Sequence, residues 1–187
     1  FYVDVGCYHP IKHSNTFRLK KKGWSGINID VEIDKIKVFN LTRRNDHNVL
    51  APVSNKNEIT RIYKTQNYGV GTTTKKDFIK NENKILDSNL LQTQTLNHII
   101  EQSPFNNREI DLLSIDTEGS DFDVLKSLNI EKYNPKIIII ESHLNKIEGV
   151  FESEIYKYLI NKKYRLRSWA FYSLIFILPN SKELRDR

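Results

Sequence analysis

The first ten residues, FYVDVGCYHP, constrain the fold more than any other part of the chain. Apolar strand formers occupy alternate positions at its start. Asp4 and Gly6 then place a carboxylate and a residue without a side chain where this strand ends, and the glycine lets the backbone approach a ligand closely. The pattern is typical of the first strand and turn of a nucleotide-binding sheet, although an ordinary tight turn has the same composition.

The segments that follow predict a helix and a second strand. The helix is expected from His13 to Lys22, with Ser14 as its N-cap, and the free amides at its start would face polar groups of a ligand. The sequence GWSGINID then supplies an apolar strand that ends at Asp30, roughly 25 residues after the glycine. In dinucleotide-binding folds an acidic residue at this position accepts hydrogen bonds from ribose hydroxyls.

The middle of the chain predicts one more helix and two strands. Apolar residues at helical spacing predict a helix over Ile33–Thr42. His47–Ser54 has the pattern of a third strand, in which Pro52 indicates an edge position or a bend rather than a central position. Ile59–Lys64 alternates apolar and polar residues, and the turn residues 55–58 predict that it forms a hairpin with the third strand.

A polar segment from Gln66 to Asp87 has no usable periodicity. Long loops inside a compact domain are more often functional than not, so we expect residues 66–76 to flank the substrate pocket and to be more mobile than the sheet. A merely solvated insertion is the alternative. After this segment, Leu90–Thr95 is predicted to be a short strand, and Thr95 to cap the next helix.

The strongest local pattern after the opening is EIDLLSIDTEGSDFDVLKSL. Its apolar residues predict a strand buried on both faces over Ile110–Ile115. Asp116 and Glu118 follow in a turn, before a helix that Ser120 would cap. Ligands bind at the carboxyl edge of open α/β sheets, so both carboxylates are candidates for a site. The alternative is that they stabilise the start of the following helix.

The sequence PKIIIIESH repeats this arrangement. It predicts a core strand over Lys136–Ile140, with Glu141 and His143 at its end. Both side chains would then lie at the same sheet edge as the previous pair of carboxylates. His143 also fits the description of an ordinary loop histidine.

The C-terminal segments predict an antiparallel end to the sheet. A helix is expected over Glu152–Asn161, followed by strands over Tyr164–Ala170 and Ser173–Leu178. The two strands have no room for a helix between them, so they are predicted to form an antiparallel hairpin. A mostly parallel sheet with an antiparallel last strand is a known mixed arrangement.

Length and composition limit the remaining classes of protein. The 187 residues fit one domain and leave no room for a second. The net charge of +6 invites a nucleic-acid partner, but the basic residues are scattered, which favours a small-molecule partner. The single cysteine, Cys7, excludes a disulfide framework and a multi-cysteine zinc site, and is expected to pack against a helix.

The ends of the chain and its apolar runs lead to three further expectations. The longest apolar run, Ile137–Ile140, is too short to span a membrane, and a cytoplasmic enzyme is expected. The chain has no methionine and begins directly on a strand, so we expect that its native N-terminal segment is missing. Residues upstream of Phe1, or a second subunit of a homo-oligomer, are candidates to complete the pocket.

Taken in order, these blocks resemble the FkbM family of S-adenosylmethionine-dependent methyltransferases over nearly the whole chain. The blocks are FYVDVGCYHP, SNTFRLKKKGWSGINID, IDLLSIDTEGSDFDVLKSL and PKIIIIESH. The SIDTEG block with its helix is fairly specific, whereas the opening glycine motif is shared across the wider superfamily. The resemblance implies an α/β fold of the Rossmann-like class I methyltransferase type. Such a fold has a mostly parallel seven-stranded sheet, helices on both faces and an antiparallel C-terminal hairpin.

The resemblance also implies which residues would hold S-adenosylmethionine. Those on its methionine and ribose side would be Asp4, Gly6, Tyr8 and His9. Asp30 would hold the ribose hydroxyls. Pro10 stands where the superfamily's opening motif usually carries a later glycine, so the path of this turn departs from the common pattern.

Relatives in the family O-methylate hydroxyls of sugars and natural-product scaffolds, and many bacterial ones look to belong to surface-polysaccharide pathways. The resemblance therefore implies O-methyl transfer to a sugar hydroxyl or a related small molecule. Such a transfer needs in-line approach of the acceptor oxygen and removal of its proton. The candidate catalytic residues are Asp116, Glu118, Glu141 and His143. If these side chains converge, a Mg²⁺ or Mn²⁺ ion could be held by Asp116, Glu141 and His143, with Glu118 as a further ligand.

Two other classes of function remain open from the sequence. An RNA methyltransferase would need a continuous basic face with exposed aromatic residues. A nucleotide-binding oxidoreductase that uses NAD would be expected to carry G-x-G-x-x-G, which this sequence lacks.

Overall fold

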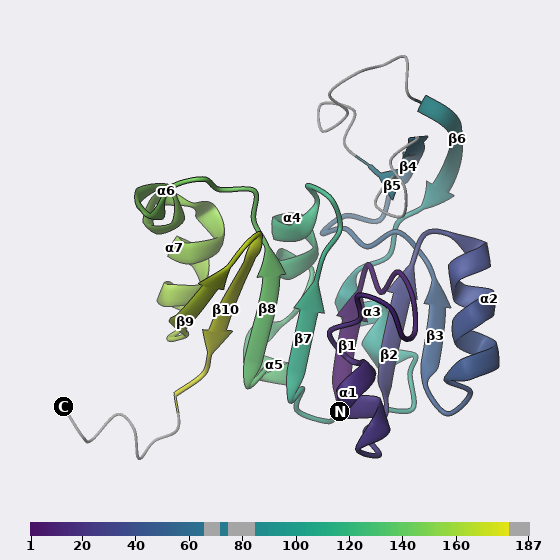
Figure 1. The fold of residues 1–187 in the computed structure, drawn as a ribbon, viewed down its shortest axis with the longest axis horizontal. Helices are drawn as coiled ribbons and strands as arrows, with labels where there is room; N and C mark the ends of the chain where they lie inside the picture. Colours follow the sequence, from purple (N-terminus) through teal and green to yellow (C-terminus); the bar gives the residue numbers. More distant parts are fainter. Residues whose placement is uncertain (66–71, 75–84, 180–187) are drawn as a thin grey trace.

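The centre of the fold is a sheet of seven strands (Figure 1): β1 (Tyr2–Val5), β2 (Gly26–Asp30), β3 (His47–Leu50), β7 (Leu112–Ile115), β8 (Ile137–Glu141), β9 (Arg165–Ala170) and β10 (Ser173–Ile177). The computed structural model describes residues 1–65, 72–74 and 85–179. The strand order is β3-β2-β1-β7-β8-β10-β9. The first five strands in this order are parallel, and β10 is antiparallel to both of its neighbours. The predicted mostly parallel sheet with an antiparallel C-terminal hairpin is confirmed.

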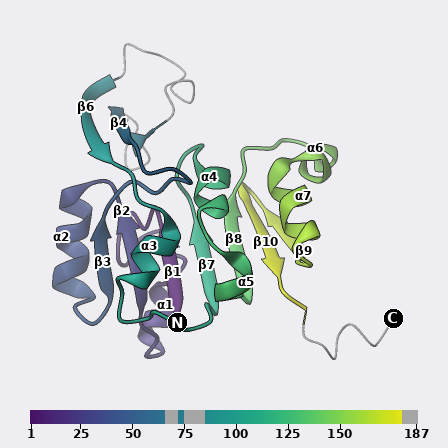
Figure 2. The ribbon, with the colours of Figure 1, turned by 180° about the vertical axis from the view of Figure 1, so that it is seen from behind.

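Helices cover both faces of this sheet, as predicted. They are α1 (Phe17–Lys21), α2 (Ile33–Thr42), α3 (Leu96–Glu101), α4 (Asp121–Lys126), α5 (Ile130–Tyr133), α6 (Ile147–Glu152) and α7 (Glu154–Asn161). Figure 2 shows α3, α4, α5 and α7 in front of one face, and the main core lies there because these helices pack buried side chains against the strands. On the other face, Ile36 and Phe39 of α2 pack against Cys7, which confirms the expected packing role of the cysteine. In the part of the chain that the structure describes, no helix is both long and apolar enough to cross a membrane.

A second, smaller sheet stands above the carboxyl ends of β1, β2 and β3 (Figure 1). Its strands are β4 (Ile59–Thr65), β5 (Thr72–Thr73) and β6 (Ile85–Gln92), and both pairings are antiparallel. The predicted hairpin between the third strand and Ile59–Lys64 is therefore wrong, because β4 pairs with β6 and not with β3. Thr93 closes the end of this pairing, since its amide donates to the Glu58 carbonyl at 2.9 Å and its hydroxyl accepts the Glu58 amide at 2.9 Å.

The third strand is also shorter than predicted. It ends at Leu50 and pairs in parallel with β2 at the edge of the main sheet. Pro52 lies just after it, which agrees with the edge position but stops the strand early, because proline offers no amide to a sheet. The chain can then leave the main sheet, and Val53 makes only an isolated bridge to Gln94.

The first helix begins later than predicted. Residues before Phe17 form a loop, in which His13 has a left-handed backbone with φ of +52°. The Ser14 hydroxyl accepts the Thr16 amide at 3.3 Å within this loop and therefore does not cap the helix. The helix is short because the loop is held by contacts with a distant residue, Arg43.

Arg43 is fully buried beneath α1 and α2, where it fastens this loop to the sheet. Its guanidinium donates to the Thr16 hydroxyl at 2.8 Å, to the Ser14 hydroxyl at 3.0 Å and to the Pro10 carbonyl. It also donates to two side chains of the sheet, Tyr2 (3.2 Å) and Asn28 (3.3 Å). The loop from Pro10 to Thr16 is thus fixed by a polar interior rather than by apolar packing.

Candidate active site

A cleft of about 310 Å³ opens at the carboxyl ends of β1, β2 and β7. The strand order changes direction at β1, because β2 and β3 extend the sheet to one side and β7 and β8 to the other. Open α/β sheets bind ligands at such a crevice. The predicted cofactor residues that line the cleft are Asp4, Gly6, Tyr8 and Asp30, and the predicted catalytic residues that line it are Asp116 and Glu118.

Gly6 allows the turns after β1 and β7 to touch. Its φ is +75°, and a side-chain carbon added there would collide with the backbone carbonyl of Asp116. The two strands are joined at the same point, since the Asp116 amide donates to the Val5 carbonyl at 2.9 Å. The glycine is therefore required by the close approach of two strand ends, in addition to any approach of a ligand.

Asp4 is a buried carboxylate on the inner wall of the cleft. The Thr16 hydroxyl donates to its Oδ2 at 2.7 Å, and Ser114 is the residue in register with it on β7. Burial raises the pKa of Asp4 to about 6, against the opposing effects of the Thr16 hydrogen bond and the nearby Arg43 charge. A positively charged ligand group beside Asp4 would favour its ionised form.

Asp30 ends β2, as predicted, and is almost fully buried. Its carboxylate accepts the Tyr8 amide at 3.1 Å and the Glu32 amide at 3.0 Å, which ties the turn after β1 to the turn after β2. Lys35 lies 3.7 Å from Asp30 and 2.8 Å from Glu32, and its ammonium also sits over the Tyr8 ring. Burial raises the pKa of Asp30 despite the opposing charge of Lys35.

His9 does not line the cleft in this structure. Its Nδ1 accepts the amides of Ile11 and Lys12, both at 3.1 Å. The histidine therefore shapes the turn that contains Pro10. Pro10, which stands where the superfamily usually has a glycine, therefore lies in a turn that the hydrogen bonds of His9 stabilise.

Thr72–Thr74 bridge the outer side of the cleft. The Thr72 hydroxyl donates to Glu32 at 2.6 Å, and the Thr73 hydroxyl donates to the Glu118 carbonyl at 2.8 Å. The small sheet is thereby connected to the turns after both β2 and β7. Apart from these three residues, the predicted mobile loop 66–76 lies outside the described residues.

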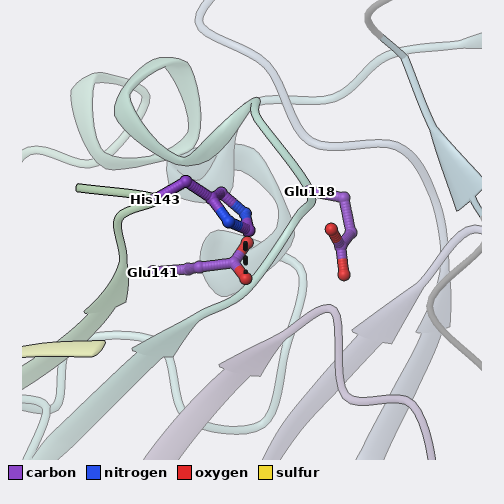
Figure 3. A group of neighbouring side chains, drawn as sticks. All are labelled: Glu118, Glu141 and His143. Atoms are coloured by element: carbon purple, nitrogen blue, oxygen red, sulfur yellow. Dashed lines mark ion pairs between the residues drawn. The ribbon is translucent and has the colours of Figure 1, made fainter. Parts of the chain in front are cut away.

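The remaining predicted catalytic residues converge beside the cleft (Figure 3). Glu118 comes from the turn after β7, and Glu141 and His143 come from the end of β8. Their ligand atoms lie within 4.8 Å of one another, and His143 Nε2 is 3.2 Å from Glu141 Oε1. Asp116 lies outside this group of three, although it was the expected ligand and Glu118 the additional one. Asp116 instead lines the wall of the cleft, where part of the residue is open to solvent although the surrounding protein still desolvates its carboxyl group.

Burial and mutual repulsion make these carboxyl groups more basic than usual. The pKa of Glu118 is raised to about 7, first by burial and then by the charge of Asp116. The pKa of Glu141 is raised to about 9, again by burial first and then by the Asp116 and Glu118 charges. Burial and the charge of Asp121 raise the pKa of Asp116. The cluster is therefore suited to accept a proton or a positive charge.

Asp121 takes the turn-stabilising role that was the alternative for Asp116 and Glu118. Its carboxylate accepts the Thr117 amide at 2.7 Å and the Gly119 amide at 3.1 Å. The predicted side-chain cap of α4 by Ser120 is wrong. The Ser120 hydroxyl lies 2.5 Å from the Thr74 hydroxyl instead.

Several residues of the cleft were not identified from the sequence. They are Lys35, Asn15 and an apolar wall formed by Ala51, Pro52, Val53 and Ile62. Thr72–Thr74 belong to the segment 66–76, which was predicted to flank the pocket, and they line the cleft. Lys35 lies in the first turn of a helix that was predicted correctly, close to the acidic end of β2, so its position beside Asp30 could have been inferred. The apolar wall could not, because it joins residues after β3 to a strand of the second sheet.

Comparison with known proteins agrees with this site. A model of the Methyltransferase FkbM domain matches residues 4–166, which include the end of β1, the cleft, the carboxylate group and the start of β9. Searches of curated proteins and of solved structures gave no match. The match covers most of the chain and both halves of the site, and the chain belongs to the FkbM methyltransferase family.

Proposed function

We propose that the protein is an S-adenosylmethionine-dependent O-methyltransferase that acts on a hydroxyl of a sugar or a related small molecule. The observation that carries this proposal is the cleft at the end of β1, β2 and β7, which joins a cofactor-like half to a carboxylate-rich half. Membership of a methyltransferase family supports methyl transfer. The carboxylate group beside the cleft supports an acceptor that must lose a proton.

The residues of the cleft fit S-adenosylmethionine. The buried Asp4 suits an ammonium group, and Asp30 at the end of β2 suits ribose hydroxyls. The apolar wall of Ala51, Pro52, Val53 and Ile62 suits a flat base. The volume of about 310 Å³ lies at the lower end of the range for small-molecule pockets.

When bound, S-adenosylmethionine supplies a methyl group on a sulfonium, and the acceptor oxygen forms its bond to that carbon as the carbon–sulfur bond breaks. The proton of the acceptor hydroxyl passes to a carboxylate of this chain. Asp116 is the proposed base, because it faces the cleft and is not one of the three side chains that gather beside it. Thr72–Thr74 would shield this region from water, since they connect the small sheet to the turn that carries Glu118.

Two experiments test the proposal. Calorimetric titration with S-adenosylmethionine and with S-adenosylhomocysteine is expected to show binding of both, with NAD as the comparison. Binding of NAD alone would contradict it. Incubation with S-adenosylmethionine and a set of nucleotide-sugars and simple glycosides is then expected to give a methylated product. Methylation of RNA and of none of these acceptors would exclude a sugar substrate.

Asp30→Ala is expected to weaken S-adenosylmethionine binding by about 1–3 kcal/mol, because two ribose hydroxyls would lose a charged acceptor. The measurement is the same titration, with circular dichroism to check the fold. Asp34→Ala is the matched control, since Asp34 is an exposed carboxylate on α2 in the same part of the chain. Equal affinities of Asp30→Ala and Asp34→Ala for S-adenosylmethionine would show that Asp30 does not contact the cofactor.

Cofactor affinity is expected to fall as the pH is lowered through about 6. Asp4 has a raised pKa of about 6, so below that pH the free protein carries a neutral acid there, and binding an ammonium group must displace its proton. The dissociation constant should then rise by up to about tenfold per pH unit. Titrations between pH 5 and 8 measure this dependence. If Asp4→Asn shows the same pH dependence of the dissociation constant, a group other than Asp4 causes it.

A further inference from the structure

We propose that Glu118, Glu141 and His143 bind a divalent cation, Mn²⁺ in preference to Mg²⁺, beside the cleft. The role given to this ion, which is to hold and activate the acceptor hydroxyl, rests on the proposed O-methyltransferase function. The binding of the ion does not rest on it.

The geometry of the three side chains is close to that of a ligand set. Two donors on adjacent positions of an octahedral ion, each about 2.1 Å from it, lie about 3 Å apart. His143 Nε2 and Glu141 Oε1 already lie 3.2 Å apart. Glu118 completes a group whose ligand atoms are all within 4.8 Å of one another, so rotation of its side chain would have to close a gap of at most about 2 Å to bring its oxygen to an adjacent ligand position.

A second, independent observation is a buried carboxyl oxygen that no N–H or hydroxyl group of the described residues reaches. Glu141 is 9% exposed, and this oxygen is its Oε2. The Glu141 carboxyl also makes a side-chain hydrogen bond with the Asp116 carboxyl, and two such acidic groups need a proton or a cation between them. A buried carboxylate oxygen is costly unless a proton, a donor or a metal compensates it. Figure 3 shows the Glu141 carboxyl next to the His143 ring, with the Glu118 side chain to one side of both, so this oxygen belongs to the group itself.

The charges around the group also favour a cation. Asp116 and Asp121 lie close enough to act on the Glu118 and Glu141 carboxyl groups. Lys35, which lines the cleft, is paired with Asp30 and Glu32, and its charge only partly offsets the effects that raise the pKa of Glu118. Asp121 is already used by the amides of Thr117 and Gly119.

The ligand types select the ion. Magnesium prefers oxygen ligands, whereas an imidazole with two carboxylates also suits Mn²⁺ and later transition metals. Three protein ligands leave positions of an octahedral ion available to acceptor oxygens, and vicinal hydroxyls of a sugar could occupy two of them. Glu118 lines the cleft as well as belonging to the group, so an acceptor held there would face the cofactor half. A cation lowers the pKa of a hydroxyl that it binds, and Asp116 would then accept the proton.

The test is titration of the protein with MnCl₂, followed by the electron paramagnetic resonance signal of free Mn²⁺, with and without S-adenosylhomocysteine. One Mn²⁺ per chain is expected to bind, and Mg²⁺ is expected to displace it only at higher concentration. Glu141→Gln and Glu118→Gln should each weaken binding by at least about tenfold. His98→Ala and Glu101→Gln, at exposed positions of α3, are the matched controls and should bind like the parent protein.

Two results would overturn the site. One is no binding at millimolar Mn²⁺, and the other is equal binding by the parent and by the folded Glu118→Gln and Glu141→Gln variants, which would mean an adventitious ion only. Glu118 is only partly buried, so its variant keeps the test decisive if Glu141→Gln does not fold. Binding of Mn²⁺ without binding of S-adenosylhomocysteine would support the cation site and contradict the proposed function. Binding of S-adenosylhomocysteine by a protein that does not bind Mn²⁺ would support the proposed function and contradict the cation site.

Discussion

Asp116→Asn is expected to slow methyl transfer about 100-fold or more, with the affinity for S-adenosylmethionine nearly unchanged. The substitution keeps the shape of the side chain and removes the charge that would accept the acceptor's proton. The backbone at this position should not move, because the Asp116 amide and not its side chain holds Val5. The measurements are the single-turnover rate with an acceptor found in the glycoside screen and the cofactor titration.

Asp116 has properties that a base needs. Burial and the neighbouring Asp121 raise its pKa, which makes the ionised carboxylate a better proton acceptor. Asp34→Asn on α2 is the control, since that side chain is exposed and outside the cleft. A wild-type rate for Asp116→Asn would exclude Asp116 as the base and leave Glu141 and His143 as the residues to test.

Arg43→Met is expected to lower the free energy of unfolding by about 3–5 kcal/mol. Methionine keeps the apolar part of the side chain but leaves the hydroxyl of Thr16 and the carbonyl of Pro10 without their buried donor. Asp4 would also lose the positive charge of Arg43, which opposes its raised pKa. Urea unfolding measures the effect, and Arg44→Met is the matched control because Arg44 is the next residue and is exposed.

The same substitution should weaken cofactor binding in the fraction that remains folded. Arg43 holds the loop from Pro10 to Thr16, and His13, Ser14 and Asn15 of that loop line the cleft. Arg43→Lys supplies fewer donors in a different geometry and is expected to give an intermediate loss. A loss of stability below about 1 kcal/mol for Arg43→Met, equal to that of Arg44→Met, would show that the loop is held by other contacts.

The elements that the sequence predicted well are those with a local cause. The helix over Ile33–Thr42 has the predicted bounds, because the 3.6-residue spacing of its apolar side chains is a property of that segment alone. Thr95 caps α3 by accepting the His98 amide, as its side chain and position predicted. The second strand ends at Asp30, as predicted, and the first ends at Val5, between the predicted Asp4 and Gly6. The mostly parallel sheet of seven strands with a C-terminal hairpin was also predicted.

The elements that the sequence predicted poorly depend on residues far apart in the chain. The start of α1 is decided by Arg43, which holds the preceding loop out of the helix from more than twenty residues away. The partner of β4 is β6 rather than β3, and alternation within a strand carries no information about which strand it will join. The alternation of Ile59–Lys64 could be predicted from the sequence, but its pairing partner could not.

For the site, the sequence by itself determined that Asp4, Asp30, Asp116 and Glu141 meet at one edge, because the carboxyl ends of parallel strands coincide. Only the tertiary structure decided which of them act together. Glu118 has a left-handed backbone, with φ of +53°, and Asp121 fixes its turn, so Glu118 rather than Asp116 joins Glu141 and His143. The direction of a side chain in a turn depends on the hydrogen bonds that hold the turn, and these come from residues whose positions the fold sets.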